Sequence, residues 1–444
     1  MPPACRQRGS PISVPGPAPD MDTGQDPAAA AGDSPDPEPL RAPAEGVPPV
    51  SVTVAEIADA ARKLSAGTGP FAVDAERASG FRYSNRAYLI QIRRRNAGTV
   101  LIDPVNHGGS PIDALRPLAE VLAEDEWILH AADQDLPCLA EVGLRPLRLY
   151  DTELAGRLAG FDRVNLAAMV QRLLGLGLAK GHGAADWSRR PLPADWLNYA
   201  ALDVEVLIEL REAVSEVLAE QGKTSWAAEE FDYLRVAESA PTRRDRWRRT
   251  SGLHKIRTVP GLAAVRELWR VRDRIARDRD IAPGRILPDA AIVAAALADP
   301  KSIDELVALP VFGGPKQRRS AKVWFAALTA ARNTDDLPEI VEPLTGPPPA
   351  SRWTRRNPEA AARLEAARSA LSELSTRMSV PTENLLAPDL VRRLCWEWAD
   401  TGDTSGTVET FLHDNGARAW QRTLTVPVLA PALARAPAET DRSD

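Results

Sequence analysis

The chain has few cysteines, three among its 444 residues. Cys5, Cys138 and Cys395 are far apart in the sequence. Their spacing excludes a disulfide framework and a zinc motif built on neighbouring cysteines. A small number of widely spaced cysteines is typical of proteins in a reducing compartment, so we expect a cytoplasmic protein.

Long apolar runs are also missing. No stretch approaches the roughly 20 apolar residues that a membrane-spanning helix needs. Residues 1–50 are rich in Pro, Ala, Gly and Asp, and they lack an apolar stretch followed by a small-residue cleavage site. We therefore expect a disordered tail rather than a signal peptide, and no membrane contact.

An excess of basic residues is the third absence. The net charge is −6 at pH 7, so the average composition does not indicate a nucleic-acid-binding protein. Two basic runs stand out locally, one at 243–249 around Trp247 and one at 316–322. Each run is as compatible with a solvated face as with a contact to phosphate.

The first half of the chain has the pattern of a layered α/β or α+β domain. Three extended segments, Phe71–Glu76, Ala87–Ile92 and Thr99–Ile102, predict an antiparallel meander with a hairpin turn at Asn96–Gly98. The further elements that we expect are helices at Val54–Leu64, Ile112–Ala123 and Asp135–Val142, after Asp151 and near Asn165, a strand at Trp127–His130, and one long helix from about Ala194 to Gln221. Such an order predicts helices packed on a sheet.

The second half is helical in pattern and contains a faint repeat. Val271–Ile292 and Ala366–Val391 both have a helix, a turn with proline, and a Pro-Asp pair that opens the next helix. Two similar small helical domains are therefore expected.

These patterns divide the chain into seven segments. In order, they are a disordered tail at 1–50, the α/β domain at 51–222, a basic helical connector at 223–257, a helical domain at 258–336, a Pro-rich linker at 337–356, a second helical domain at 357–428, and a disordered tail at 429–444.

Asp74 and Glu76 are the first candidates for chemistry. Side chains two residues apart share one face of a strand, so these two carboxylates project together while Val73 points into the core. Neighbouring carboxylates raise each other's pKa unless a cation lies between them. For an Asp-x-Glu pair alone, two hydrated acids at a strand end are the more common explanation.

Asp203 strengthens the case for a metal site. The apolar stripe of the long helix runs through Leu207, Leu210, Val214 and Val217, and its extension reaches Asp203 and then Tyr199. An acid on the core-facing line is costly unless it is paired or binds metal. The alternative is a first turn that emerges into water.

Asp135 is equivocal from its position alone. Asp133 and Asp135 both precede a predicted helix, where acids stabilise the N-terminus. We expect Asp133 to cap the helix, and the physics of the sequence does not assign Asp135.

Resemblance to a family assigns it. Three segments, Val73–Glu76, His130–Leu136 and Tyr199–Val204, resemble the three motifs of the DEDD superfamily of exonucleases. Their order and spacing match the ribonuclease D branch, which Asp186–Leu192 also resembles, and the resemblance covers about 51–222. Tyr199, four residues before Asp203, marks the subtype with tyrosine in the third motif. The helical repeats are similar to the helicase-and-RNase-D C-terminal (HRDC) domain, more closely in the first than in the second.

The resemblance implies a ribonuclease-H-like fold and two bound divalent cations, Mg²⁺ or Mn²⁺. Hard cations of this kind prefer carboxylate oxygens. By the family pattern Asp74 bridges both ions, Glu76 and Asp203 complete the site of the ion that carries the attacking water, and Asp135 serves the second ion. Tyr199 orients the water.

Several neighbours are candidate substrate contacts. Tyr88 and Gln91 lie on the second strand, where family members contact the terminal nucleotides, although strand packing explains Tyr88 equally well. Lys180, His182 and Arg190 are candidate phosphate contacts, with a plain surface role as the alternative. We expect His130 to be a packed strand-end residue and Asp151 to cap a helix.

The leading hypothesis is a 3′-5′ exoribonuclease that releases nucleoside 5′-monophosphates from RNA with a free 3′ end. The family's usual task implies tRNA precursors as substrates, HRDC domains as an auxiliary nucleic-acid-binding surface, and a monomer. One alternative is a 3′-5′ exonuclease of single-stranded DNA, because proofreading domains share this metal site. The other is an inactive nucleic-acid-binding scaffold, which the presence of all four acids and the tyrosine disfavours.

Overall fold

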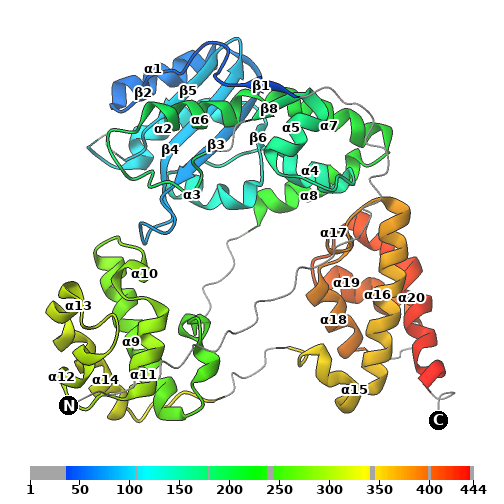
Figure 1. The fold of residues 1–444 in the computed structure, drawn as a ribbon. Helices are drawn as coiled ribbons and strands as arrows, with labels where there is room; N and C mark the ends of the chain where they lie inside the picture. The colour runs from blue at the N-terminus through cyan, green and yellow to red at the C-terminus, as the bar shows by residue number, and fades with distance from the viewer. Residues whose placement is uncertain are drawn as a thin grey trace, which may run out of the picture. The chain divides into compact units, whose positions relative to one another are not determined.

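The structure is a computed structural model that describes residues 37–105, 108–178, 181–237, 245–340, 346–398 and 402–440. For residues 437–440 it describes the backbone alone. The described residues from Glu38 onward belong to one compact unit. Figure 1 shows the domains of this unit. Most of the tail predicted at 1–50 lies outside the described residues.

A mixed six-stranded sheet forms the centre of the first domain, in the order β2-β5-β4-β3-β6-β7. Its strands are β2 (Val50–Ser51), β3 (Thr68–Arg77), β4 (Ala87–Arg95), β5 (Gly98–Ile102), β6 (Trp127–Leu129) and β7 (Leu149–Asp151). The β3-β4-β5 meander is antiparallel, as predicted, and the other three strands run parallel to their neighbours. The predicted α/β fold class is therefore confirmed.

Helices cover both faces of this sheet (Figure 1). Phe71, Val73 and Ala75 of β3 point to one face, where they pack against α1 (Val54–Ser65), α2 (Pro111–Leu122) and α3 (Leu136–Glu141). The alternation of β3 leaves the opposite face for Ala72, Asp74 and Glu76. The remaining helices of the domain are α4 (Thr152–Leu158), α5 (Leu166–Leu174), α6 (Ala194–Glu205), α7 (Leu207–Glu220) and α8 (Thr224–Val236).

The prediction of one long helix from Ala194 to Gln221 is wrong, because the helix is interrupted at Val206, between α6 and α7. Val206, Leu207 and Ile208 are consecutive and all buried. The break lets α6 pack on β3, β4 and β5 while α7 packs on β3 and β6.

The end of the predicted N-terminal tail is ordered, so that prediction is wrong for residues 38–50. β1 (Glu38–Leu40) pairs in parallel with β8 (Leu176–Leu178) in a small second sheet, and β2 pairs with β5. Edge strands tolerate proline because one side of the strand needs no hydrogen bond. A proline-rich composition therefore did not exclude strand pairing here.

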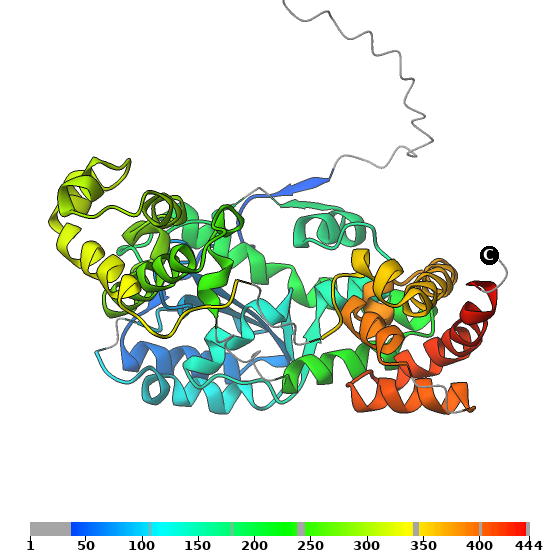
Figure 2. The ribbon, with the colours of Figure 1, turned by 90° about the horizontal axis from the view of Figure 1, so that it is seen from below.

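Two helical domains follow, each with a core of its own. The first contains α9 (Val259–Asp278), α10 (Pro283–Ile286), α11 (Asp289–Ala298), α12 (Ile303–Ala308), α13 (Pro315–Arg319) and α14 (Ala321–Arg332). The second contains α15 (Trp353–Arg356), α16 (Pro358–Met378), α17 (Thr382–Leu385), α18 (Pro388–Trp396), α19 (Thr404–Asp414) and α20 (Ala419–Thr440). Figure 2 shows the helices of the second domain, coloured orange to red, gathered together.

The predicted repeat is present in the structure. Both α9-α10-α11 and α16-α17-α18 consist of a long helix, a four-residue helix and a third helix. Asp280 (φ 47°) and Ser379 (φ 49°) occupy equivalent positions after the long helices, and both are left-handed. This conformation ends each long helix at the same point.

Two predicted boundaries need correction. Trp247 and Ile256 are buried in the core of the first helical domain, so this domain begins within the predicted connector. The predicted C-terminal tail is helical as far as Thr440, and Leu429 and Leu433 are fully buried. Their spacing of four residues places both on one face of α20, a short apolar stripe that composition alone did not reveal. No described helix is long and apolar enough to span a membrane.

The loop between β3 and β4 contacts the first helical domain through Asp280. The Asp280 carboxylate accepts hydrogen bonds from the Ser84 backbone N–H at 2.8 Å, the Arg86 guanidinium at 3.1 Å and the Tyr88 hydroxyl at 3.2 Å. The Tyr83 hydroxyl donates to Asp273 at 3.0 Å. This loop begins directly after the strand that carries Asp74 and Glu76.

Candidate active site

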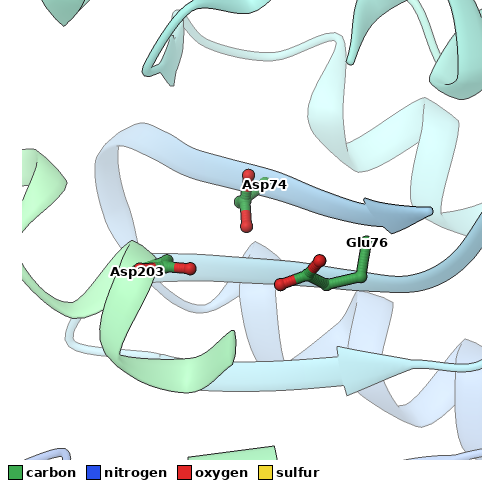
Figure 3. A group of neighbouring side chains, drawn as sticks. All are labelled: Asp74, Glu76 and Asp203. Carbon is green, nitrogen blue, oxygen red and sulfur yellow. The ribbon is translucent and has the colours of Figure 1, made fainter. Parts of the chain in front are cut away.

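Three carboxylates from two elements meet above the middle of the sheet. Asp74 and Glu76 project from β3 and Asp203 projects from α6, with one oxygen of each within 4.8 Å of the others (Figure 3). The strand alternation and the helix stripe each predicted part of this arrangement. A group of hard oxygen ligands at this spacing fits a divalent cation.

Burial raises the pKa of every acid in this group, and repulsion by neighbouring carboxylates raises the pKa of Glu76 and Asp203 further. Desolvation by burial raises the pKa of Glu76 to about 10, and the charges of Asp74 and Asp203 add to the effect. Desolvation raises the pKa of Asp74 to about 6, and it also places the pKa of Asp203 well above its ordinary value. Each shift reports a carboxylate held without sufficient positive charge, which a bound cation would supply.

Tyr199 lies one turn before Asp203 on α6, and interaction with its hydroxyl lowers the pKa of Asp203, against the larger effect of burial. Burial raises the pKa of Tyr199, and the charge of Asp203 raises it further, so the phenol stays protonated. The backbone of Gly181 lies against the tyrosine ring so closely that a Cβ at this position would overlap it. Tyr199 therefore has little freedom to swing away from the carboxylates.

Asp135 lies at the start of α3 and is buried, but it is outside the group of three. Desolvation by burial raises its pKa to about 8, and the charge of Asp74 contributes. Asp133 is exposed and accepts no capping hydrogen bond, so its predicted role as a cap is wrong. The backbone N–H groups of Ala131 and Ala132, at the start of this turn, donate hydrogen bonds to the carboxylate of Asp151.

The predicted capping by Asp151 is confirmed, because its carboxylate also accepts the N–H groups of Glu153 and Leu154 at the start of α4. His130, also as predicted, is a packed residue whose Nδ1 lies 2.9 Å from the Thr152 hydroxyl. Its pKa is lowered to about 4 by burial.

Gln91 lies directly opposite Asp74 in the antiparallel register of β3 and β4, so the two side chains share a face. The residue is fully buried, and neither its amide oxygen nor its amide nitrogen has a hydrogen-bond partner in the described part of the chain. Leaving such groups unpaired costs about 1–3 kcal/mol each. Its position and its unused hydrogen-bonding groups fit a ligand next to Asp74.

The other candidate substrate contacts differ in whether their side chains already have partners within the protein. The Tyr88 hydroxyl is engaged with Asp280, as described above. The Arg190 guanidinium pairs with Asp103 at 2.6 Å and donates to the Tyr88 carbonyl at 2.7 Å. His182 lies edge-on to Tyr199, with ring centroids 5.9 Å apart. Lys180 lies outside the described residues.

Arg77 is the residue that the sequence reasoning missed. It follows Glu76 on β3, and its guanidinium lies 3.5 Å from the Asp135 carboxylate. Strict alternation would turn Arg77 away from Glu76. The strand register shifts between these two residues, a local irregularity for which the sequence gives no signal.

Comparison with known proteins agrees with this geometry. Residues 50–219 match the family described as 3'-5' exonuclease, residues 261–328 match the HRDC domain, and residues 346–433 match the family described as 3' to 5' exonuclease C-terminal domain. The second helical domain thus matches a different family from the first, although the two share an order of helices.

Curated relatives carry one name. Ribonuclease D of Nitrobacter hamburgensis is 28% identical over 319 residues, which cover 69% of this chain and 78% of the relative. Ribonuclease D of Gluconacetobacter diazotrophicus is 30% identical over 269 residues, covering 59% and 67%. For ribonuclease D of Jannaschia the values are 32% over 252 residues, with the match spanning 54% of this chain and 63% of the relative's length.

Solved structures match most of the length of this chain. A protein from Bifidobacterium adolescentis is 36% identical, with a TM-score of 0.80, and the match covers 90% of this chain and all of that one. Escherichia coli RNase D, described as an exoribonuclease involved in structured RNA processing, is 23% identical with a TM-score of 0.63, covering 87% and 98%. At 23% identity, the likeness to Escherichia coli RNase D is evidence for the fold alone.

The fold, the acidic group and the family match together define a metal-dependent 3′-5′ exonuclease domain. The chain belongs to the ribonuclease D family. Its class of activity is therefore that of a 3′-5′ exoribonuclease.

Proposed function

We propose that the chain shortens RNA from a free 3′ end, one nucleoside 5′-monophosphate at a time, using two Mg²⁺ or Mn²⁺ ions. The observation that carries the proposal is the group formed by Asp74, Glu76 and Asp203, one buried and two half-buried carboxylates gathered in one site. Burying such a group without a cation is costly, and two divalent ions would offset that cost.

Asp74, Glu76 and Asp203 would hold one ion, and Asp74 with Asp135 would hold the other. When bound, two such ions supply Lewis acidity to the attacking and leaving oxygens of a phosphodiester. The Tyr199 hydroxyl, fixed by Asp203, orients the attacking water. Water adds its oxygen to the terminal phosphorus and the bond from phosphorus to the 3′ oxygen breaks, so the shortened RNA keeps a 3′ hydroxyl.

Gln91 is the strongest candidate for a contact to the terminal nucleotide, because its buried amide has hydrogen-bonding groups to spare. Lys180 remains a candidate phosphate contact. Tyr88 and Arg190 would act through the positions of the strand and loop that they hold.

The helical domains would hold RNA upstream of the 3′ end through phosphate and sugar contacts. Lys322 and Arg318 of the second basic run are exposed and suit this task. Within the first run Arg248 stacks on Trp247, and Arg243 lies outside the described residues. We further propose tRNA precursors as substrates, a monomeric state and a cytoplasmic location.

A digestion experiment tests the proposal. Matched RNA and single-stranded DNA oligonucleotides, labelled at the 5′ end, would be incubated with the full chain and Mn²⁺, with and without chelator. We expect a ladder of RNA products that chelator abolishes, and slower loss of DNA. Equal or faster loss of DNA would favour the DNA exonuclease, and intact RNA would favour the inactive scaffold.

Asp74→Asn separates catalysis from binding. We expect cleavage to fall by about a thousandfold or more, because the ligand shared by both ions is lost. RNA affinity should change less than threefold, since the two basic runs lie elsewhere. Asp133→Asn, which alters an exposed acid near the site, is the matched control and should cleave normally. Loss of binding with retained cleavage would contradict the assigned roles.

A further inference from the structure

Arg77 brings a fixed positive charge to the edge of the acidic group. Its guanidinium lies 3.5 Å from Oδ1 of Asp135 and 3.4 Å from the side-chain oxygen of Gln134. The Arg77 side chain is 23% exposed and that of Asp135 is 8% exposed. Because the pair is largely withdrawn from water, its attraction is screened less than that of a surface pair.

Asp135 differs from the other three acids because it forms an ion pair with Arg77. Asp74, Glu76 and Asp203 have oxygens within 4.8 Å of each other, a spacing that one cation can bridge, and Asp135 lies outside that group. It is nevertheless close enough to be affected by the charge of Asp74. Asp135 therefore lies between two places for a cation, the guanidinium on one side and the acidic group on the other.

We propose that Arg77 is a positioning residue that competes with the second metal ion for the carboxylate of Asp135. The inference rests on the proposed function, because it concerns the ions named there. In the metal-free protein the guanidinium holds Asp135. The second ion must displace that contact before it can use the carboxylate as a ligand.

The phosphate of an incoming RNA would ease this exchange. It offers oxygens to the second ion and an acceptor to the released guanidinium, which forms strong hydrogen bonds with phosphate. Without RNA, binding of the second ion has neither advantage. The two ions should therefore bind the free protein with different affinities, the second more weakly.

Titration of Mn²⁺ into the full chain without RNA tests this competition. Isothermal titration calorimetry, together with electron paramagnetic resonance of free Mn²⁺, reports both affinities. We expect the wild type to bind one ion at least about tenfold more tightly than the second. Arg77→Ala should tighten the weaker site about tenfold and the tighter site by less than threefold.

Three further variants separate competition from a general effect of charge. Arg77→Lys keeps the charge and should retain the weak second site. Arg95→Ala removes one positive charge from an exposed ion pair with Glu212, and it should leave both affinities unchanged. Arg77→Ala combined with Asp135→Asn should lose the second site altogether. Circular dichroism melting checks that each variant folds.

The outcomes distinguish the inference from the function on which it rests. Equal tightening of both sites by Arg77→Ala, or no tightening of either, would overturn the competition while leaving the metal site in place. A wild-type chain that binds no Mn²⁺ would overturn both. A selective gain at the weaker site supports the role of Arg77.

Discussion

Buried carboxylates that repel each other make the stability of the metal-free protein depend on pH. The pKa values of Asp74 and Asp135 rise from 3.8 to about 6 and about 8, and that of Glu76 rises from 4.5 to about 10, all chiefly through desolvation. A group whose pKa is raised on folding contributes its full stability below its unfolded pKa. That contribution is lost as the pH rises through the folded value.

We therefore expect the chelator-treated protein to melt at a temperature about 5 °C or more lower at pH 8 than at pH 5. Saturating Mn²⁺ should remove most of this difference, because the cation compensates the charges that appear as pH rises. Differential scanning fluorimetry with and without Mn²⁺ measures both effects. A Mn²⁺-induced rise that is no larger at pH 8 than at pH 5 would contradict the expectation.

Gly181 tests whether the position of Tyr199 matters for catalysis. A methyl group at Gly181 would overlap the tyrosine ring, whereas one at Gly183 would lie 3.7 Å from the tyrosine hydroxyl, an ordinary contact. Gly181→Ala should lower kcat by about tenfold to a hundredfold, since a small misplacement of an orienting group is costly. Mn²⁺ affinity should be retained, and Gly183→Ala should behave as wild type. Equal kcat in the two variants would show that the ring has room to shift.

At the scale of residues, the sequence predicted those parts of the site whose side chains share one strand or one helix. Asp74 and Glu76 share a strand face, and Asp203 with Tyr199 shares a helix face, so periodicity alone brought them into view. The ion pair between Arg77 and Asp135 joins a strand end to the start of a helix 58 residues later. No periodic pattern encodes such a pair, because it depends on a register shift and on tertiary packing.

At the scale of elements, apolar periodicity gave the positions of most helices and strands but not their ends. The break at Val206 lets α6 pack on β3, β4 and β5 while α7 packs on β3 and β6. The ordering of 38–51 arises because open backbone groups of β5 and β8 accept a further strand. Both outcomes depend on neighbours that a local pattern does not contain.

The C-terminal helix gives an element-scale prediction. Leu433 is fully buried in the core of the second helical domain, although it lies in the segment predicted to be a tail. Leu433→Ala should destabilise that domain by about 2–5 kcal/mol, the usual cost of a cavity of this kind. Arg435→Ala, an exposed position on the same helix, is the control. Urea denaturation followed by circular dichroism measures the difference, and equal midpoints would mean that the end of α20 contributes nothing.

At the scale of the whole molecule, the catalytic domain and the first helical domain meet at the loop that follows the catalytic strand. Asp280 receives hydrogen bonds from Ser84 and Arg86 of this loop and from Tyr88 at the start of β4. Asp280 also has a left-handed backbone, a conformation that asparagine and aspartate tolerate better than most residues. Sequence alone predicted both domains, but it gave no sign of this contact, since its residues are nearly 200 positions apart.

Asp280→Ala should loosen this contact while leaving the metal site intact. Hydrogen exchange at the Ser84 amide, which donates to Asp280 at 2.8 Å, should accelerate about tenfold or more. Because the helical domain then holds RNA less firmly relative to the carboxylates, trimming of a 3′ end beside a stem should slow more than digestion of an unstructured oligonucleotide. Asp278→Ala, an exposed acid at the end of α9, serves as the control and should match the wild type in both measurements. Equal slowing on the two RNAs would mean that Asp280 acts on the catalytic strand itself, and unchanged exchange at Ser84 would mean that the contact is not formed in solution.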